Sequence, residues 1–134
     1  METYMDELTV KAKLEHMDAV QAFISVRLAN APPKLRNKIS IAVDEIFSNI
    51  AVYAYGGGEG EVTVRVQADG GVVLEFEDCG TAYNPLAAEE PDVSLSAEER
   101  EIGGLGIFLV KNIMDSAEYR REGGKNILTV KKNL

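Results

Sequence analysis

A long helical pattern from Lys34 to Tyr55 constrains the fold of this chain more than any other segment. Its apolar side chains recur at intervals of three and four residues and form one stripe along the helix. The stripe consists of Ala42, Val43, Ile46, Phe47, Ile50 and Ala54. Because a helix with one apolar face buries that face against a second layer, this pattern predicts a layered domain. Glycines at 56–58 are expected to end the helix.

Alternating apolar and polar side chains predict strands on both sides of this helix. The first strand is predicted at Leu8–Leu14, and a helical pattern follows from Asp18 until two consecutive prolines interrupt it at 32–33. Residues 61–66 and 72–77 alternate again, and the turn sequence at 69–71, Asp-Gly-Gly, predicts that they pair as a hairpin.

The C-terminal part of the chain predicts one more helix and one more hairpin. Between Gly80 and Gly104 the sequence has no periodic pattern and forms a loop of unusual length for so small a domain, which is typical of a functional lid or a disordered segment. An apolar helix is predicted at Leu105–Met114, and a hairpin at 119–130 turns at the glycines 123–124.

The order of these elements predicts one domain over residues 1–134 with an α+β fold. Two helices follow the first strand, and the strands do not alternate singly with helices, which disfavours a dinucleotide-binding α/β fold. We expect a two-layer α/β sandwich in which helices cover one face of a mostly antiparallel mixed sheet.

Composition narrows the classes of partner and compartment. The chain carries 22 acidic and 14 basic residues, a net charge of −8, and its basic residues are mostly dispersed, which argues against direct binding of nucleic acid. Cys79 is the only cysteine, so an internal disulfide and a cysteine-based zinc cluster are excluded. No apolar run approaches the roughly 20 residues of a membrane span. We therefore expect a cytoplasmic protein that does not enter a membrane.

Three polar clusters stand out as candidate functional residues. Glu45 and Asn49 lie four residues apart at the edge of the apolar stripe, where a solvated pair is the simplest interpretation. Asp78-Cys-Gly80 follows a predicted strand, where a turn is the simplest interpretation but a carboxylate could also accept a hydrogen bond from a ligand. A third cluster, Gly-Gly-Leu-Gly at 103–106, opens a helix and forms either a hinge or an anion-binding helix start.

Taken together, the three clusters and the long loop between the last two resemble the ATP-binding domain shared by gyrase, heat-shock chaperones, histidine kinases and mismatch-repair ATPases, the Bergerat-type fold. The sequence at 44–55, Asp-Glu-Ile-Phe-Ser-Asn-Ile-Ala-Val-Tyr-Ala-Tyr, is most similar to that of the bacterial anti-sigma-factor serine/threonine kinases. The resemblance covers nearly the whole chain.

The resemblance implies a role for each candidate residue. Glu45 matches the general base, and Asn49 matches the ligand of the Mg²⁺ ion that accompanies ATP. Asp78 would accept from the adenine amino group, and Gly80 would allow the base to stack. Residues whose main chain would contact the phosphates are Gly103, Gly104, Leu105 and Gly106. An ATP lid is implied at about 82–102.

The sequence departs from the family pattern at three places, one of which is a pair of residues. Tyr53 stands where these kinases usually have histidine, Ala82 replaces the second glycine of the Asp-X-Gly-X-Gly motif, and Lys125-Asn126 replaces Gly-Thr in the last strand. Ala82 and Asn126 are therefore expected to modify the contacts on the adenine side, where alanine is still small and Asn126 can still hydrogen-bond water.

The resemblance implies an ATP- and Mg²⁺-dependent kinase that phosphorylates a serine or threonine of a small anti-sigma-factor antagonist, often a STAS-type domain. A sigma factor or similar regulator would be the second partner, and homodimers are common among such kinases. An alternative is an ATP-dependent protein-binding switch without transferase activity, in which Glu45 is not a base. A third interpretation is an α+β domain whose glycines only form turns.

Overall fold

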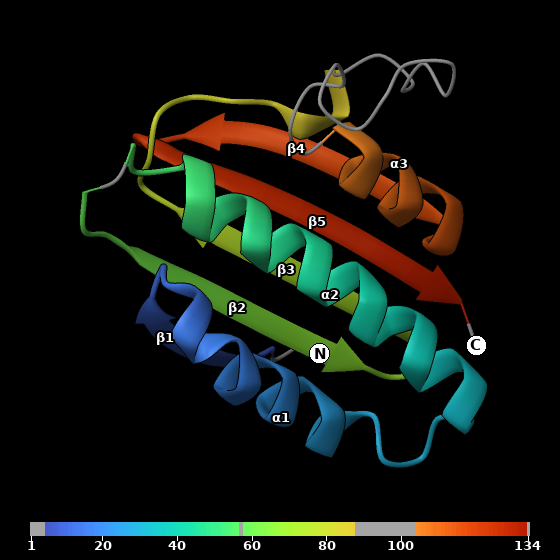
Figure 1. Ribbon diagram of the computed structural model, residues 1–134. Helices are drawn as coiled ribbons and strands as arrows, with labels where there is room; N and C mark the ends of the chain where they lie inside the picture. Colours follow the sequence, from blue (N-terminus) through green and yellow to red (C-terminus); the bar gives the residue numbers. More distant parts are fainter. Residues whose placement is uncertain (1–4, 57, 88–103, 134) are drawn as a thin grey trace.

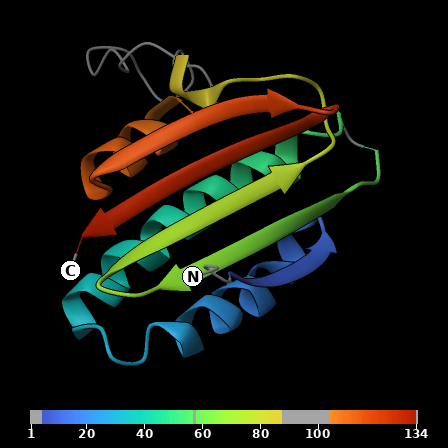
Figure 2. The ribbon, with the colours of Figure 1, turned by 180° about the vertical axis from the view of Figure 1, so that it is seen from behind.

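The structure is a computed structural model that describes residues 5–56, 58–87 and 104–133, and in these residues three α-helices pack on one face of a five-stranded sheet (Figure 1). Figure 2 shows the opposite face of the sheet, with the helices behind it. The elements in chain order are β1 (Asp6–Lys11), α1 (Met17–Arg27), α2 (Pro33–Tyr53), β2 (Glu61–Ala68), β3 (Gly71–Asp78), α3 (Gly104–Ile113), β4 (Ser116–Glu122) and β5 (Lys125–Asn133). The predicted α+β sandwich is confirmed.

The strands are ordered β1-β2-β3-β5-β4, and all four pairings among the described strands are antiparallel. Three of these pairings join strands that are neighbours in the sequence of strands. The fourth joins β3 to β5, because the chain passes through α3 before it returns as the last hairpin. This pairing places Asp78 directly opposite Asn126, although the two residues are 48 positions apart in the chain.

The apolar stripe predicted on the long helix forms the centre of the core. Five of its six residues are buried, and Ala54 is partly buried at the end of the helix. Phe47 has no exposed surface, and shortening such a side chain to alanine costs about 3–5 kcal/mol. From the sheet, alternate side chains of β2 and β3 point toward the helices, for example Val64 and Phe76. The core thus holds α2 against the sheet, where it runs along strands β2 and β3 (Figure 1).

The first strand differs from its prediction in position. It was predicted at 8–14, but β1 ends at Lys11, which pairs with Glu61 at the start of β2. After that point Ala12 N donates to Gly60 O, and Leu14 lies in a short 3₁₀ helix with 55% of its surface exposed. The alternating pattern therefore extends past the last residue of β1 that has a partner in β2, and the pairing with β2 decides where β1 ends. Among the described residues, no helix is long and apolar enough to cross a membrane.

Candidate functional site

A cavity of about 620 Å³ lies between α2 and the ends of β3 and β5, within the range of volumes usual for small-molecule sites. Residues from α3, from β4 and from the segment after β3 complete its lining. Apolar side chains form most of its walls, among them Ile46, Ile50, Phe76, Ile107, Val110 and Leu128. Such a cavity offers a flat apolar ligand a surface to pack against.

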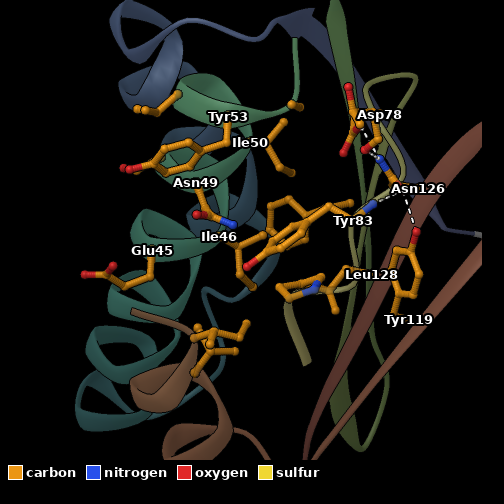
Figure 3. A pocket seen from close by; sticks show the side chains of 18 of the residues that line it. Glu45, Ile46, Asn49, Ile50, Tyr53, Asp78, Tyr83, Tyr119, Asn126 and Leu128 are labelled. Atoms are coloured by element: carbon orange, nitrogen blue, oxygen red, sulfur yellow. Dashed lines mark hydrogen bonds between the residues drawn. The ribbon is translucent and has the colours of Figure 1, made fainter. Parts of the chain in front are cut away.

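The helix α2 contributes the first predicted pair of polar residues. Glu45 and Asn49 both line the cavity and are both half-buried, one helical turn apart. Figure 3 shows the carboxamide of Asn49 pointing into the cavity and the carboxylate of Glu45 pointing away from its centre. Tyr53, one turn further along, also lines the cavity, but its hydroxyl points away. Of these three residues, Asn49 is therefore the one whose polar group points into the cavity.

The sheet contributes a buried carboxylate at the last residue of β3. Asp78 has 6% of its surface exposed, and its Oδ1 accepts from the backbone N–H of Gly80 at 2.8 Å and from Nδ2 of Asn126 at 2.9 Å. No donor among the described residues reaches the second oxygen, Oδ2. One carboxylate oxygen is thus held in place, and the other is available to a donor on a ligand.

Asn126 connects the carboxylate to the rest of the cavity through four hydrogen bonds. Its Nδ2 donates to Asp78 Oδ1 and to the carbonyl oxygen of Thr81, both at 2.9 Å. Its Oδ1 accepts from the hydroxyl of Tyr119 at 2.5 Å and from the backbone N–H of Tyr83 at 3.3 Å. The hydrogen-bonding capacity of a carboxamide is thereby filled. In this arrangement Asn126 orients Asp78, and the dashed lines in Figure 3 trace the connection.

Gly80 allows the segment after β3 to pack closely on the end of α2. A Cβ at this position would lie 2.1 Å from the carbonyl oxygen of Ala54, closer than any side chain could tolerate. The same carbonyl accepts from Thr81 N at 3.0 Å, and Arg121 Nη1 donates to Gly80 O at 2.9 Å. The structure thus requires a glycine here for packing within the protein, whether or not a base stacks nearby.

Tyr55 joins the end of α2 to both neighbouring strands. Its hydroxyl donates to the carbonyl oxygen of Glu61 at 2.5 Å and accepts from the backbone N–H of Cys79 at 2.8 Å. Burial, with a smaller contribution from the charge of Asp78, raises the pKa of the Tyr55 phenol above its ordinary value. Tyr55 therefore holds the helix that carries Asn49 against the strand that carries Asp78.

Two aromatic residues of the cavity were missed by the sequence analysis. Tyr83 has 53% of its surface exposed, and Figure 3 places its ring inside the cavity, between α2 and the sheet. Its position in the predicted loop, a few residues after Asp78, was the only available signal. Tyr119 lies on β4, and nothing in its local sequence indicated a contact with Asn126.

The remaining predicted residues are placed only in part. Ala82 lines the cavity and is exposed. Gly104, Leu105 and Gly106 form the first residues of α3, as the prediction of a glycine-rich helix start requires. Gly103 and most of the predicted lid, which together cover 88–103, lie outside the described residues. The roles of all these residues stay predictions.

The model of the histidine kinase-like ATPase domain family matches residues 10–132, and the chain belongs to this family. Membership of an ATPase family implies that the chain binds ATP. The chain is 32% identical to the serine/threonine-protein kinase BtrW of Bordetella bronchiseptica over 100 residues, which cover 72% of this chain and 70% of BtrW. It is 25% identical to the serine-protein kinase RsbW of Bacillus cereus over 138 residues, which cover 93% of this chain and 82% of RsbW. The resemblance to the bacterial anti-sigma-factor serine/threonine kinases is thereby confirmed.

Proposed function

We propose that this chain is an ATP- and Mg²⁺-dependent serine/threonine protein kinase that phosphorylates a small anti-sigma-factor antagonist. One observation carries the proposal: Asp78, oriented by Asn126, lines the same cavity as Glu45 and Asn49 on the opposite wall. Recognition of the adenine base and transfer of the phosphoryl group would then take place on two sides of one cavity. The protein would also hold a sigma factor or similar regulator inactive until the phosphorylation state of the antagonist changes. It would act as a homodimer in the cytoplasm.

ATP fits the chemistry of the residues present. The available oxygen of Asp78 would accept from the adenine amino group, and the apolar wall around Ile50 and Leu128 would pack against the base. The helix α3 begins at Gly104, and the first N–H groups of a helix have no partner within it. Those groups would donate to the phosphates, with the positive end of the helix dipole favouring the negative charge.

The polar residues on α2 suit the roles of metal ligand and general base. The carboxamide of Asn49 points into the cavity, and its oxygen is a hard ligand of the kind that Mg²⁺ prefers. When bound, Mg²⁺ supplies neutralisation of phosphate charge. Glu45 would turn toward the cavity and accept the proton of the incoming serine or threonine hydroxyl, so that one helix holds the metal and removes the proton.

The test of this proposal is Glu45→Gln, with Asp44→Asn as the matched control. Asp44 is the neighbouring carboxylate on α2 and is exposed outside the cavity. We expect Glu45→Gln to lower phosphate transfer to a purified STAS-type antagonist about 100-fold or more, while the ATP affinity stays within about twofold. Transfer is measured with ATP labelled at the γ-phosphate, and affinity by calorimetry with Mg²⁺.

Asp44→Asn should change neither quantity. Transfer by Glu45→Gln at the wild-type rate would show that Glu45 is not the base. No ATP binding by the wild-type protein would remove the proposal altogether.

A second candidate function is favoured by the orientation of Glu45, whose carboxylate points away from the cavity centre. In an ATP-dependent binding switch, ATP would change the affinity for the regulator without any transfer of phosphate. Wild-type protein that binds ATP, changes its affinity for a sigma factor and yet phosphorylates no antagonist would establish this switch in place of the kinase.

A further inference from the structure

A second cavity, of about 410 Å³, lies at the other end of α2, between this helix and α1. Figure 1 shows the two helices side by side, joined by a short connection at this end. Buried Ile24 and Ile39 contribute to the apolar part of the groove, and Ser25 and Asn37 add polar groups. Along α2, Arg36 in this groove is about 20 Å from Asn49, and the groove shares no lining residue with the cavity beside Asp78. We call it the α1–α2 groove.

Arg36 lines the α1–α2 groove, and its guanidinium has no acceptor among the described residues. Its Nε is buried and has no hydrogen-bond partner in the described part of the chain. The other arginines in the described part of the chain each donate to a carboxylate or a carbonyl oxygen: Arg27 to Asp6, Arg65 to Glu7, Arg120 to Glu122 and Arg121 to Gly80. Because buried N–H groups are almost always paired with protein or with water, the Nε–H of Arg36 is open to an acceptor from outside the described residues.

The groove lies in the one long stretch of the sequence without acidic residues. Residues 19–43 contain none, although the whole chain has 22, and they include Lys34, Arg36 and Lys38. None of these three side chains forms an ion pair with a described residue. The N-terminus of α2 begins in the same place without a side-chain cap, so its free N–H groups add positive potential. This end of an acidic protein is therefore locally basic.

We infer that the α1–α2 groove binds an acidic, amphipathic segment of a protein partner. An apolar side chain of the segment would lie over Ala22 and Pro33, which are the exposed apolar residues of the groove. A carboxylate would pair with the planar guanidinium of Arg36 through two hydrogen bonds. A protein segment is favoured over nucleic acid because the net charge of −8 repels a polyphosphate chain and because part of the groove is apolar. The inference does not require kinase activity.

The test measures binding of a labelled amphipathic peptide of leucine and glutamate to the full chain by fluorescence anisotropy. An analogue with glutamine in place of every glutamate is the neutral probe. We expect saturable binding of the glutamate peptide, about tenfold or more weaker binding of the glutamine peptide, and a similar loss for Arg36→Gln. The Arg36 Nε–H signal in ¹⁵N NMR should move on addition of the glutamate peptide.

Arg120→Gln is the matched control, because Arg120 is exposed on β4 and already paired with Glu122. It should keep peptide binding within about twofold of wild type. Calorimetric ATP binding by Arg36→Gln, unchanged from wild type, shows that the variant is folded and separates this test from that of the kinase.

Three results would overturn the inference. One is peptide binding that is equal for wild type and Arg36→Gln, or equal for the two peptides. Another is a single-stranded DNA oligonucleotide that occupies the groove and displaces the peptide. The third is a wild-type dimer that Arg36→Gln converts to a monomer in sedimentation, because a second copy of the chain would then be the occupant.

Discussion

Replacing Asp78 by asparagine should change which purine the protein prefers. The asparagine oxygen can take the place of Oδ1 and keep the hydrogen bonds from Gly80 N and from Asn126 Nδ2. Its NH₂ group then occupies the position of Oδ2, the oxygen that no described donor reaches. A donor would face the adenine amino group where an acceptor stood before, so the variant should lose ATP affinity while the surrounding hydrogen bonds persist.

The size of this loss follows from the bond removed. A hydrogen bond to a charged group contributes about 1.5–3 kcal/mol, and each 1.4 kcal/mol corresponds to a factor of about ten in affinity. We therefore expect Asp78→Asn to weaken ATP binding by about 10- to 150-fold. Inosine triphosphate carries a carbonyl oxygen in place of the amino group, so the new NH₂ donor should favour it, and the ratio of ATP to inosine triphosphate affinity should fall sharply.

Calorimetric titration of both nucleotides, with and without Mg²⁺, measures these affinities directly. The matched control is Asp69→Asn, because Asp69 is an exposed carboxylate in the turn between β2 and β3, outside the cavity. The control should bind both nucleotides as wild type does. An Asp78→Asn variant that binds ATP within about twofold of wild type, or that keeps the wild-type preference between the two purines, would refute the proposal that Asp78 binds the adenine base.

Two further predictions concern the tyrosines of the site. Tyr83→Ala should weaken ATP binding about tenfold, because stacking of a base on an aromatic ring contributes about 1–3 kcal/mol; tighter binding in the same titration would show instead that the ring blocks the cavity. Tyr55→Phe should lower the free energy of unfolding at pH 7 by about 1–2 kcal/mol, because the hydrogen bonds with Glu61 and Cys79 are lost. Since burial raises the Tyr55 pKa in the folded state, its protonated form adds stability that is complete below pH 10.0 and is lost as the pH rises through the folded-state pKa. Urea unfolding across this alkaline range should show a smaller loss for Tyr55→Phe than for wild type, and parallel losses would contradict the role of Tyr55.

Local patterns were sufficient to predict most elements and one wall of the candidate site. The spacing of apolar residues on α2 placed Glu45 and Asn49 at the edge of the core, and both line the cavity. The glycines of the turns were also predicted from local sequence. In the structure, Gly70 and Gly123 adopt positive φ angles, which glycine tolerates best. The end of β1 was predicted wrongly because it depends on where β2 begins, which the alternation within β1 does not contain.

The opposite wall depended on contacts between distant parts of the chain. Asn126 was expected to take part in contacts on the adenine side, but its four hydrogen bonds and its position as the orienting partner of Asp78 follow from the pairing of β3 with β5. The glycine at position 80 has a packing reason in Ala54, which the motif alone did not indicate. Tyr119 reaches the site only because β4 lies next to β5.

The sequence by itself determined the order and kind of the elements, the polar pair on α2 and the family resemblance, because each rests on residues close together in the chain. The tertiary structure alone decided which strand lies beside β3, which side chains line the cavity next to Asp78, and that Arg36 Nε in the α1–α2 groove has no partner among the described residues. The physical reason is that strand order and side-chain pairing are set by packing of the whole core, and short-range periodicity does not encode that packing.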